Sequence, residues 1–551
     1  MRRLLALAAL LFAFLAPSAN ADFILYVSPS SRKLLEQDAV DLKTRANRWR
    51  DVLVERKAAF TIVTHPAQLA QMPPRSALIL PSAAYLADDE RRIILQRLEA
   101  GDSLLATWMP GTLDAKGAAI APTFVEQVFK VGTKPAPTGD KGFLITVGDT
   151  PLTHALPAGS RLWVGNERRY PTPLLATTGA GYLSDWSRAE GDTGLLAFTT
   201  VGESRRALIG YTEGAWDMRA KDFVSIAQRA LDWVEGRPVA YLRNWPWPYR
   251  GAVTIGVDAL WRFENVPRIA EVLKASGTHG SFHFLPADAT ANAAVIRELV
   301  KSGHSLGGFG DAAQPFAGQP EGEQRARVER MVQGFRTALD AGVPVNGLRA
   351  PQGATDAATE KAAEALDYLV DTGRIDSAVP MLAANRKLVL LPASTNIDSN
   401  ASAESVASGL DAAARRAQLL AGYSFIGVDV AGFQPDAPIT ASLPRFIDVT
   451  KRESLWAASA AEVASWWREH EQIQVASTWD PAASSMILDV TVGESMPFPA
   501  AIEIVPPPGR KARLEGSVPG AQLQSSPSGA MTLVLTGLPA GRHRLQVRFQ
   551  P

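Results

Sequence analysis

Short apolar runs alternate with amphipathic stretches through the first part of the chain, and turn residues separate them. The runs with strand character are residues 23–27, 60–63, 76–81 and 103–108. A helix fits residues 37–57, and another begins after Ala87, where the acids at 88–90 suit the positive end of a helix dipole. Strands that alternate with helices predict βαβ units. We therefore expect an α/β domain over residues 22–240.

The unit of strand, acidic helix, glycine and strand over residues 76–108 resembles the flavodoxin-like fold of the class I glutamine amidotransferases. The resemblance implies a fold and not an activity, because those enzymes use a cysteine nucleophile after a strand and this chain contains no cysteine. We expect a binding or scaffolding role for this domain.

A second series of strand and helix signals follows a connector at residues 241–250, which contains Trp-Pro-Trp-Pro. The strand signals are residues 251–258, 280–284, 303–308, 345–353, 368–372 and 425–430, and helix signals lie at 267–274, 294–301 and 323–340. Several of the strands end in an acidic residue. Repeated units of this kind predict a (β/α) barrel over residues 241–470, with acids at the C-terminal ends of its strands.

The end of the chain changes to short strands separated by glycine and proline turns. These strands are residues 486–492, 501–505, 512–515, 531–536 and 543–549. The spacing predicts a small β-sandwich over residues 471–551, of immunoglobulin-like or carbohydrate-module type. Apart from Trp479 it has no cluster of aromatics for stacking on sugars, so we expect a packing module.

The first residues have the pattern of a signal peptide. Arg2 and Arg3 precede an apolar core at residues 4–15, and the small residues at 19 and 21 predict cleavage before Asp22. The core is shorter than an ordinary membrane span, and no later stretch is long and apolar enough for one. We expect residues 1–21 to be removed and the mature chain to be periplasmic or secreted. A retained N-terminal anchor is the alternative.

Composition narrows the classes of function. The 551 residues include 56 Lys and Arg and 56 Asp and Glu, so no net field favours nucleic acid or an anionic membrane. The absence of cysteine excludes disulfides, thiolate nucleophiles and cysteine-ligated metals. We therefore expect no nucleic-acid partner, and the sequence predicts no oligomeric state.

Segments of the central region resemble, in order, the signatures of the NodB-type polysaccharide deacetylases, carbohydrate esterase family four. They are Ile-Gly-Val-Asp at 255–258, Gly-Ser-Phe-His at 280–283, Gly-His-Ser-Leu-Gly at 303–307, Arg-Ala-Pro-Gln-Gly at 349–353 and the tryptophan-rich stretch 455–467. The Arg-x-Pro-x-Gly motif of the family is intact. The resemblance covers roughly residues 247–470 and implies a NodB-type barrel with a carbohydrate polymer as its partner.

In active members of that family, an Asp and a His-x-x-x-His pair bind a divalent metal, while a second Asp is the general base and a late His the acid. By resemblance, Asp258 is the metal-type Asp, but the base position is Val257 and the two metal histidines fall on Phe309 and Ala313. No His lies between residues 304 and 470 to replace the acid. We predict no metal or other cofactor, unless a divalent-metal site has been rebuilt around Asp258.

Polar and aromatic side chains remain at the expected barrel mouth. We predict catalytic roles for Asp258, His283, Arg349 and Asp371, and substrate binding by Trp261 and Pro351. Other candidates of the same region are His279, His304, Asp311 and Asp429. Two alternatives stay open: His283 as a hydrogen-bonded core residue, and Asp258 with Arg349 as a buried ion pair that holds the barrel mouth. The aromatics Trp245, Trp247 and Trp261 could line a sugar groove or pack between domains.

Three functions fit these residues. The first is a non-catalytic protein that binds or scaffolds envelope or extracellular carbohydrate. The second is an atypical hydrolase that removes N- or O-acetyl groups from a polysaccharide, supported by Asp258, Arg349 and Asp371. The third is a structural envelope protein without a ligand. Metal binding by a ligand set that includes Asp258 separates the first two, because family-type water activation requires it.

Overall fold

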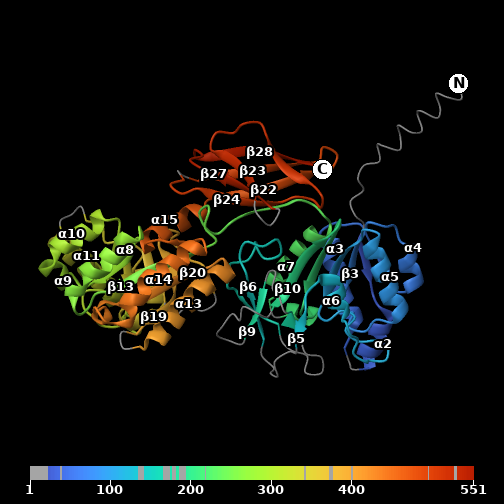
Figure 1. Ribbon diagram of the computed structural model, residues 1–551, viewed down its shortest axis with the longest axis horizontal. Helices are drawn as coiled ribbons and strands as arrows, with labels where there is room; N and C mark the ends of the chain where they lie inside the picture. Colours follow the sequence, from blue (N-terminus) through green and yellow to red (C-terminus); the bar gives the residue numbers. More distant parts are fainter. Residues whose placement is uncertain are drawn as a thin grey trace.

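The protein is described here from a computed structural model. It describes residues 23–37, 40–134, 142–164, 174–175, 181–184, 194–217, 219–339, 343–371, 377–398, 401–493, 496–525 and 530–551. The predicted signal peptide lies outside these residues. Figure 1 shows an α/β unit at one end, drawn blue to green, a second α/β unit at the other end, drawn green to orange, and red β-sheets beside their junction.

The first unit is built on a sheet that begins with parallel strands in the order β2-β1-β3-β4-β11. Their bounds are β1 Phe23–Tyr26, β2 Phe60–Val63, β3 Ala77–Leu80, β4 Ser103–Thr107 and β11 Ser204–Ile209. Beyond β11 the sheet continues through antiparallel β10 (Gly194–Val201), β9 (Gly181–Ser184), β6 (Phe143–Thr146) and β7 (Arg161–Trp163). The smaller strands β5 (Thr133–Lys134) and β8 (Leu174–Leu175) belong to the same sheet: they pair with each other, and β8 pairs with β10.

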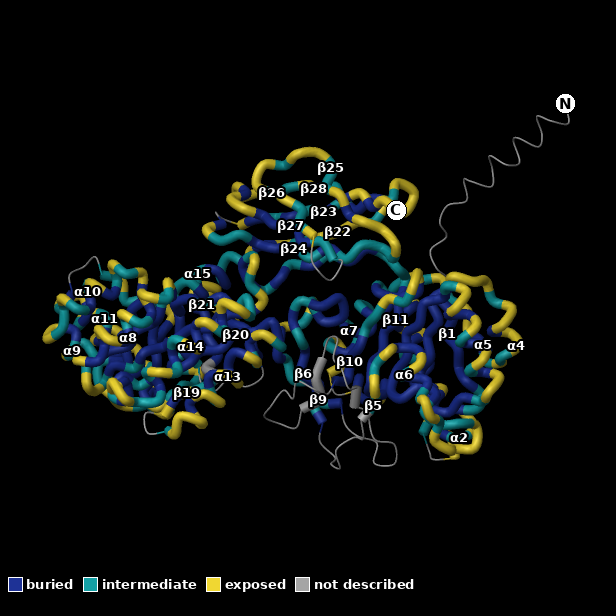
Figure 2. The backbone as a smooth tube through the Cα atoms, in the orientation of Figure 1, coloured by how far each residue is buried: buried dark blue, intermediate teal, exposed yellow. Residues whose placement is uncertain are grey.

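Helices cover both faces of these parallel strands, which is why the strands are apolar at consecutive positions. Leu25, Ile79 and Leu105 pack in one cluster with α3 (Leu42–Glu55) and α7 (Ala220–Val234). Neighbouring residues such as Leu78 and Leu104 pack in another cluster with α5 (Asp88–Glu99) and α6 (Phe124–Phe129). Figure 2 shows the strands of this unit buried and its outer helices exposed.

The helix predicted at residues 37–57 is two helices. They are α2 (Pro29–Gln37) and α3, and α3 begins after Asp41, whose carboxylate accepts a hydrogen bond from the Thr44 backbone N–H at 3.2 Å. An aspartate at this position satisfies a free N–H of the first turn, so it starts a helix. A short helix, α4 (Pro66–Gln71), completes the first unit.

The second unit is a curled sheet of parallel strands, and pairing runs in the order β13-β14-β15-β16-β17-β19-β20 and back to β13. The bounds are β13 Gly251–Asp258, β14 Ser281–Phe284, β15 Ser305–Gly308, β16 Gly347–Arg349, β17 Tyr368–Asp371, β19 Val389–Ile397 and β20 Tyr423–Asp429. Two further strands join it: β21 (Leu455–Ala457) beside the start of β13, and β18 (Met381–Leu382) beside β19. The predicted α/β class is confirmed for this unit, and the sheet is curled. We call it the barrel.

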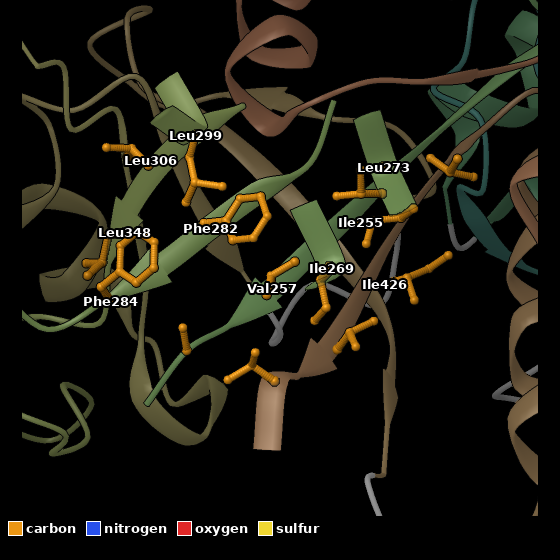
Figure 3. Packing of buried hydrophobic residues seen from close by; sticks show 14 of the residues in the cluster. Ile255, Val257, Ile269, Leu273, Phe282, Phe284, Leu299, Leu306, Leu348 and Ile426 are labelled. Carbon is orange, nitrogen blue, oxygen red and sulfur yellow. The ribbon is translucent and has the colours of Figure 1, made fainter. Parts of the chain in front are cut away.

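Helices surround the barrel strands. They are α8 Val266–Ala275, α9 Pro286–Ala291, α10 Ala293–Lys301, α11 Glu321–Leu339, α12 Ala357–Ala362, α13 Ala403–Leu420, α14 Pro438–Arg452 and α15 Ala460–His470. Alternate residues of β13 and β14, among them Val257 and Phe282, point outward and pack with helix residues such as Ile269 (Figure 3). No helix among the described residues combines the length and hydropathy needed to cross a bilayer.

The remaining positions of these strands face the barrel interior, which is filled by large side chains. Glycines on neighbouring strands provide the space: a Cβ on Gly256 would lie 2.1 Å from the Phe425 ring, and one on Gly347 would lie 2.2 Å from the Tyr368 ring. Both aromatic side chains are fully buried. At these positions the interior is therefore a packed core and not an open channel.

The C-terminal region forms two four-stranded sheets, β12-β24-β27-β26 and β22-β23-β28-β25. Their bounds are β12 Val239–Leu242, β22 Gln474–Asp480, β23 Ser485–Val492, β24 Ala500–Val505, β25 Lys511–Glu515, β26 Ala521–Ser525, β27 Met531–Leu535 and β28 Gly541–Gln550. Alternate residues of both sheets, such as Leu488 and Ile502, share one buried cluster. We call these sheets the C-terminal β-domain.

Strand β12 belongs to the C-terminal β-domain although it precedes the barrel in the sequence. Val239 pairs with Val505 and Leu242 with Ile502, in antiparallel register. The boundary predicted at residue 240 falls inside this strand. The chain therefore contributes to the C-terminal β-domain, forms the whole barrel, and then returns to complete the same domain.

Candidate active site

The C-terminal ends of three neighbouring barrel strands carry the polar residues that the sequence singled out. In register, Asp258 on β13 pairs with His283 on β14 and with Asp429 on β20. Residues paired in this way in a parallel sheet point to the same face. Figure 1 shows β13 and β20 within the same unit. The sequence-predicted Asp258 and His283 are thus brought together on the inner side of the barrel.

An ion pair between Asp258 and Arg349 crosses this end of the barrel. Arg349 Nη2 donates a hydrogen bond to Asp258 Oδ2 at 2.8 Å, and its Nε lies 2.7 Å from Oδ1. The Arg349 side chain is 7% exposed and the Asp258 side chain is 21% exposed. Burial raises the pKa of Asp258 above its ordinary value, and Arg349 opposes this effect, while the charge of Asp429 adds to it. Both carboxylate oxygens of Asp258 therefore face a guanidinium.

Further contacts fix the position of Arg349. Its Nη2 also donates a hydrogen bond to Asn396 Oδ1 on β19 at 2.8 Å, and its guanidinium carbon lies 5.0 Å from the centre of the Phe425 ring. A Cβ on Gly427 would approach Asn396 Oδ1 to 2.4 Å and Arg349 Nη2 to 2.6 Å. The glycine on β20 therefore leaves the space that the guanidinium and the amide occupy.

His283 lies in the packed interior of the barrel. Its side chain is fully buried, its Nε2 is 3.3 Å from the Tyr368 hydroxyl oxygen, and the rings of Phe309 and Phe425 flank it. Burial lowers the pKa of His283 well below its ordinary value, and the charge of Arg349 acts in the same direction. The imidazole is therefore neutral and enclosed, which matches the alternative of a core histidine.

The other predicted residues lie around the rim. Asp371 ends β17, is partly exposed, and accepts a hydrogen bond from Thr355 Oγ1 at 2.9 Å. Pro351 is buried in the short turn after β16, where Gln352 has a positive φ of 59°. Trp261 follows β13 by a few residues and is 69% exposed. Asp258, Arg349 and His283 therefore form one group, and Trp261 presents its indole to solvent near that end of the barrel.

The remaining candidates have structural partners. His279 Nδ1 is 2.9 Å from Glu462 Oε1, and His304 Nδ1 accepts a hydrogen bond from the Gly280 backbone N–H at 3.0 Å. Asp311 is held by Arg327 and Arg330 at 2.9 and 2.7 Å. Asp429 accepts a hydrogen bond from the Ala431 backbone N–H at 2.9 Å and caps the turn that follows β20.

The side chains of this site do not fit the divalent metal that the resemblance implies. Within the described part of the chain, no three His, Asp or Glu side chains are grouped so that they could hold a metal ion. The carboxylate of Asp258 is occupied by Arg349, and the metal-histidine position at Phe309 is an apolar ring that is 3% exposed. We derive no reaction step through a metal.

Sequence reasoning missed Asn396 and the two rings that close the interior, Tyr368 and Phe425. The strand at residues 389–397 is not among those predicted, although Leu388 to Leu391 form an apolar run at its start. That apolar run is the available sequence signal for β19. A strand predicted from it would have placed Asn396 near the strand end. The hydrogen bond to Arg349 itself depends on which strands become neighbours.

No curated protein sequence matches the chain. Similar solved structures include one described as a "probable Polysaccharide deacetylase" from Pseudomonas aeruginosa PAO1, at 18% identity over 41% of this chain and 94% of that one, with a TM-score of 0.35. A family 4 carbohydrate esterase from Streptomyces lividans, in complex with acetate, matches at 16% identity over 38% and 92%, with a TM-score of 0.28.

A wild-type pseudoenzyme of family CE4 from Bacillus anthracis is also similar, at 13% identity over 39% of this chain and 65% of that one, with a TM-score of 0.30. The match that names a family comes from the sequence of the barrel. Residues 249–370, from the start of β13 into β17, match the family model for polysaccharide deacetylase, and the chain therefore carries a polysaccharide deacetylase domain in its barrel.

Proposed function

We propose that the protein is a polysaccharide deacetylase-like protein that binds a carbohydrate polymer and lacks metal-dependent deacetylase activity. The observation that carries the proposal is the Asp258–Arg349 ion pair, with contacts of 2.7 and 2.8 Å at the position of the family's metal-type aspartate. A carboxylate neutralised by a guanidinium is a poor ligand for a divalent cation, because the arginine must first be displaced.

The missing acid and base support the same conclusion. Val257 stands at the base position and is fully buried, and His283 is fully buried with its pKa well below its ordinary value. Deacetylation needs a group that takes a proton from water and a group that stabilises the oxyanion. Neither role has an accessible residue among Asp258, His283 and Arg349.

Carbohydrate binding rests on the family match and on the rim of the barrel. The family model names polysaccharide deacetylases, so a glycan is the ligand class that the barrel inherits. Trp261, 69% exposed, offers an indole face on which a sugar ring can pack. The partly exposed Asp371 offers a hydrogen-bond acceptor at the same end of the barrel.

The other regions complete the proposal. The parallel strand order of the first unit, β2-β1-β3-β4-β11, supports a flavodoxin-like domain with a binding or scaffolding role. The paired sheets of the C-terminal β-domain support a packing module of β-sandwich type. The pattern of residues 1–21 supports export to the periplasm or beyond.

The test uses the purified mature protein and its Asp258→Ala variant. We expect elemental analysis to find no stoichiometric metal in either protein, and no acetate release from N-acetylated chito-oligosaccharides. Stoichiometric metal in the wild type that is lost in Asp258→Ala, together with acetate release, would instead establish an atypical active hydrolase.

Glycan binding is tested separately by isothermal titration with the same oligosaccharides. We expect Trp261→Ala to weaken binding at least fivefold, since aromatic contacts contribute about 1 kcal/mol or more. Trp479→Ala is the matched control, because Trp479 is a partly exposed tryptophan of the C-terminal β-domain. Equal affinity of the wild type and Trp261→Ala would exclude Trp261 from the binding site.

A further inference from the structure

A cavity of about 810 Å³ lies where the first unit, the barrel and the C-terminal β-domain meet. It is lined by the loop at residues 147–151, the connector around Trp247 and the segment 505–510. Arg250, which also lines it, precedes β13, whereas Asp258 ends that strand. The cavity therefore lies at the opposite end of the barrel strands from the Asp258–Arg349 pair and is a separate site.

The walls of this cavity are held by hydrogen bonds between the three parts of the chain. Asp149 Oδ1 accepts from the Asn244 backbone N–H at 2.9 Å, and the Tyr241 hydroxyl donates to the Asp149 carbonyl at 3.1 Å. The Trp245 indole N–H donates to the Ala421 carbonyl at 2.8 Å. Strand β12 joins the same connector to the C-terminal β-domain. Such contacts make the cavity a built feature of the fold.

Two buried polar atoms on these walls lack a hydrogen-bond partner among the described residues. They are Asp149 Oδ2 and Arg205 Nε. Asp149 Oδ2 lies 3.9 Å from Arg243 Nε, which is too long for a hydrogen bond, and the Asp149 side chain is 12% exposed. A buried polar group without a hydrogen-bond partner costs free energy. A polar ligand that supplies the missing partner therefore gains affinity from this site.

The rim adds cations and an aromatic ring. Arg250 and Arg510 line the cavity and are exposed, and no salt bridge involves either of them within the described ranges. The half-buried Trp247 lines the cavity as well, with the Arg243 guanidinium 5.8 Å from its ring centre. The arginines that line the cavity outnumber its two acidic residues, Asp149 and Glu503.

We propose that this cavity binds an acidic saccharide, a sugar chain that carries carboxylate groups. The guanidinium groups of Arg250 and Arg510 suit a carboxylate, because the planar fork can donate two parallel hydrogen bonds. Trp247 offers a face for a sugar ring. The volume lies within the range of roughly 300–1,000 Å³ that is typical of small-ligand sites.

The two acids of the lining distinguish a saccharide from a bare anion. Asp149 and Glu503 can accept hydrogen bonds from sugar hydroxyls, whereas they repel an ion such as phosphate. Burial raises the pKa of both carboxyls, that of Asp149 to about 6, so a hydroxyl donor would stabilise their charged form. A ligand with both hydroxyls and carboxylates therefore offers partners to Asp149 and Glu503 as well as to Arg250 and Arg510.

The test is titration calorimetry of the full mature chain with tetragalacturonate, chitotetraose and inorganic phosphate as separate probes. We expect tetragalacturonate to bind, and the double variant Arg250→Ala/Arg510→Ala to weaken it at least tenfold. Trp247→Ala should also weaken it. The control removes two exposed arginines elsewhere, Arg75→Ala/Arg325→Ala, and should leave binding unchanged. Binding should weaken as NaCl rises from about 0.05 to 0.5 M.

Three results would overturn the proposal: no binding of tetragalacturonate, equal binding by the wild type and the Arg250→Ala/Arg510→Ala variant, or displacement of tetragalacturonate by phosphate at equal concentration. The last result would show an anion site without saccharide recognition. All variants leave Asp258, Arg349 and Trp261 intact. Failure here would therefore leave the proposal for the barrel mouth unaffected, and chitotetraose binding reports on that mouth independently.

Discussion

The Asp258–Arg349 pair makes a specific prediction about the substitution Arg349→Met. Methionine keeps an unbranched apolar stem of similar length but removes the charge that neutralises Asp258. The Asp258 carboxylate would then remain 79% buried, as its 21% exposure implies, without a cation. Removing one partner of a buried pair costs about 3–5 kcal/mol, because the other charge is left uncompensated.

The structure sets where in that range the loss should fall. Partial exposure of Asp258 favours the lower end, about 3 kcal/mol. Loss of the hydrogen bond to Asn396 and of the contact with the Phe425 ring adds roughly 1 kcal/mol. The expected loss in the free energy of unfolding at pH 7 is therefore about 4 kcal/mol. The double variant Asp258→Asn/Arg349→Met should recover about half of it.

The sign of the pH dependence follows from Asp258. Its folded-state pKa lies above its ordinary value, and removal of Arg349 raises it further. A carboxyl whose pKa is raised by folding contributes stability at pH values below its pKa in the unfolded chain. That stability is lost as the pH rises through its pKa in the folded protein. The destabilisation by Arg349→Met should therefore be larger at pH 7 than at pH 4.

Native-state hydrogen exchange of peptides from β13 and β16 measures the opening free energy of the barrel apart from the other units. Measurements at pH 4 and pH 7, corrected for intrinsic exchange, give the two values to compare. A loss below about 1 kcal/mol at pH 7, or equal losses at both pH values, would refute the buried pair and with it the assignment of Asp258 as unavailable to metal.

Other changes have equally defined outcomes. Burial raises the pKa of Asp149 from 3.8 to about 6, so ionisation of Asp149 destabilises the fold as the pH rises through that interval. Asp149→Asn should therefore raise the free energy of unfolding at pH 8 by up to about 3 kcal/mol and leave it unchanged at pH 3. Urea unfolding at the two pH values measures both effects. Gly427→Ala should cost about 1–3 kcal/mol because of its contacts with Arg349 and Asn396, whereas Gly322→Ala, with nothing within 4 Å, should be neutral or stabilising. A fragment of residues 471–551 should elute as aggregate in size-exclusion chromatography, since it exposes the edge of β24 that β12 covers, and appending residues 237–243 to its end should restore a monomer.

The sequence predicted elements well where one segment carries its own pattern. Residues 251–258 were predicted as a strand and form β13 with the same bounds, because an apolar run ends there at an acid. Residues 267–274 were predicted as a helix and form most of α8, whose apolar face packs on the barrel. Local periodicity is sufficient for such elements.

Elements that depend on distant partners were missed. Strand β22 (Gln474–Asp480) is mostly exposed and lacks a strong apolar alternation, and its pairing with β23 decides its structure. The sequence predicts the end of one domain and the start of a connector where β12 lies, because only the register of β12 with β24 reveals its place. Tertiary pairing therefore determined what local propensity did not.

The candidate site shows the same division. The order of motifs placed Asp258 and Arg349 near one another, and the buried ion pair that was one of two alternatives is present at 2.7 Å. Asn396 and the enclosure of His283 by Phe309 and Tyr368 could not be predicted, because four separate segments of the barrel supply these side chains. The roles of Asp371, Trp261 and Pro351 remain predictions.

The place of β12 in the chain has a consequence for the order of folding. Strand β12 is synthesised before the barrel and its partner β24 after it, so pairing them closes a loop that contains a whole unit. The entropy cost of such closure grows with the length of unfolded chain. In the folded barrel, Gly251 pairs with Leu455, which holds the two ends of that loop together. The barrel should therefore fold first, and substitutions that slow it should leave the C-terminal sheets unassembled although their own residues are unchanged.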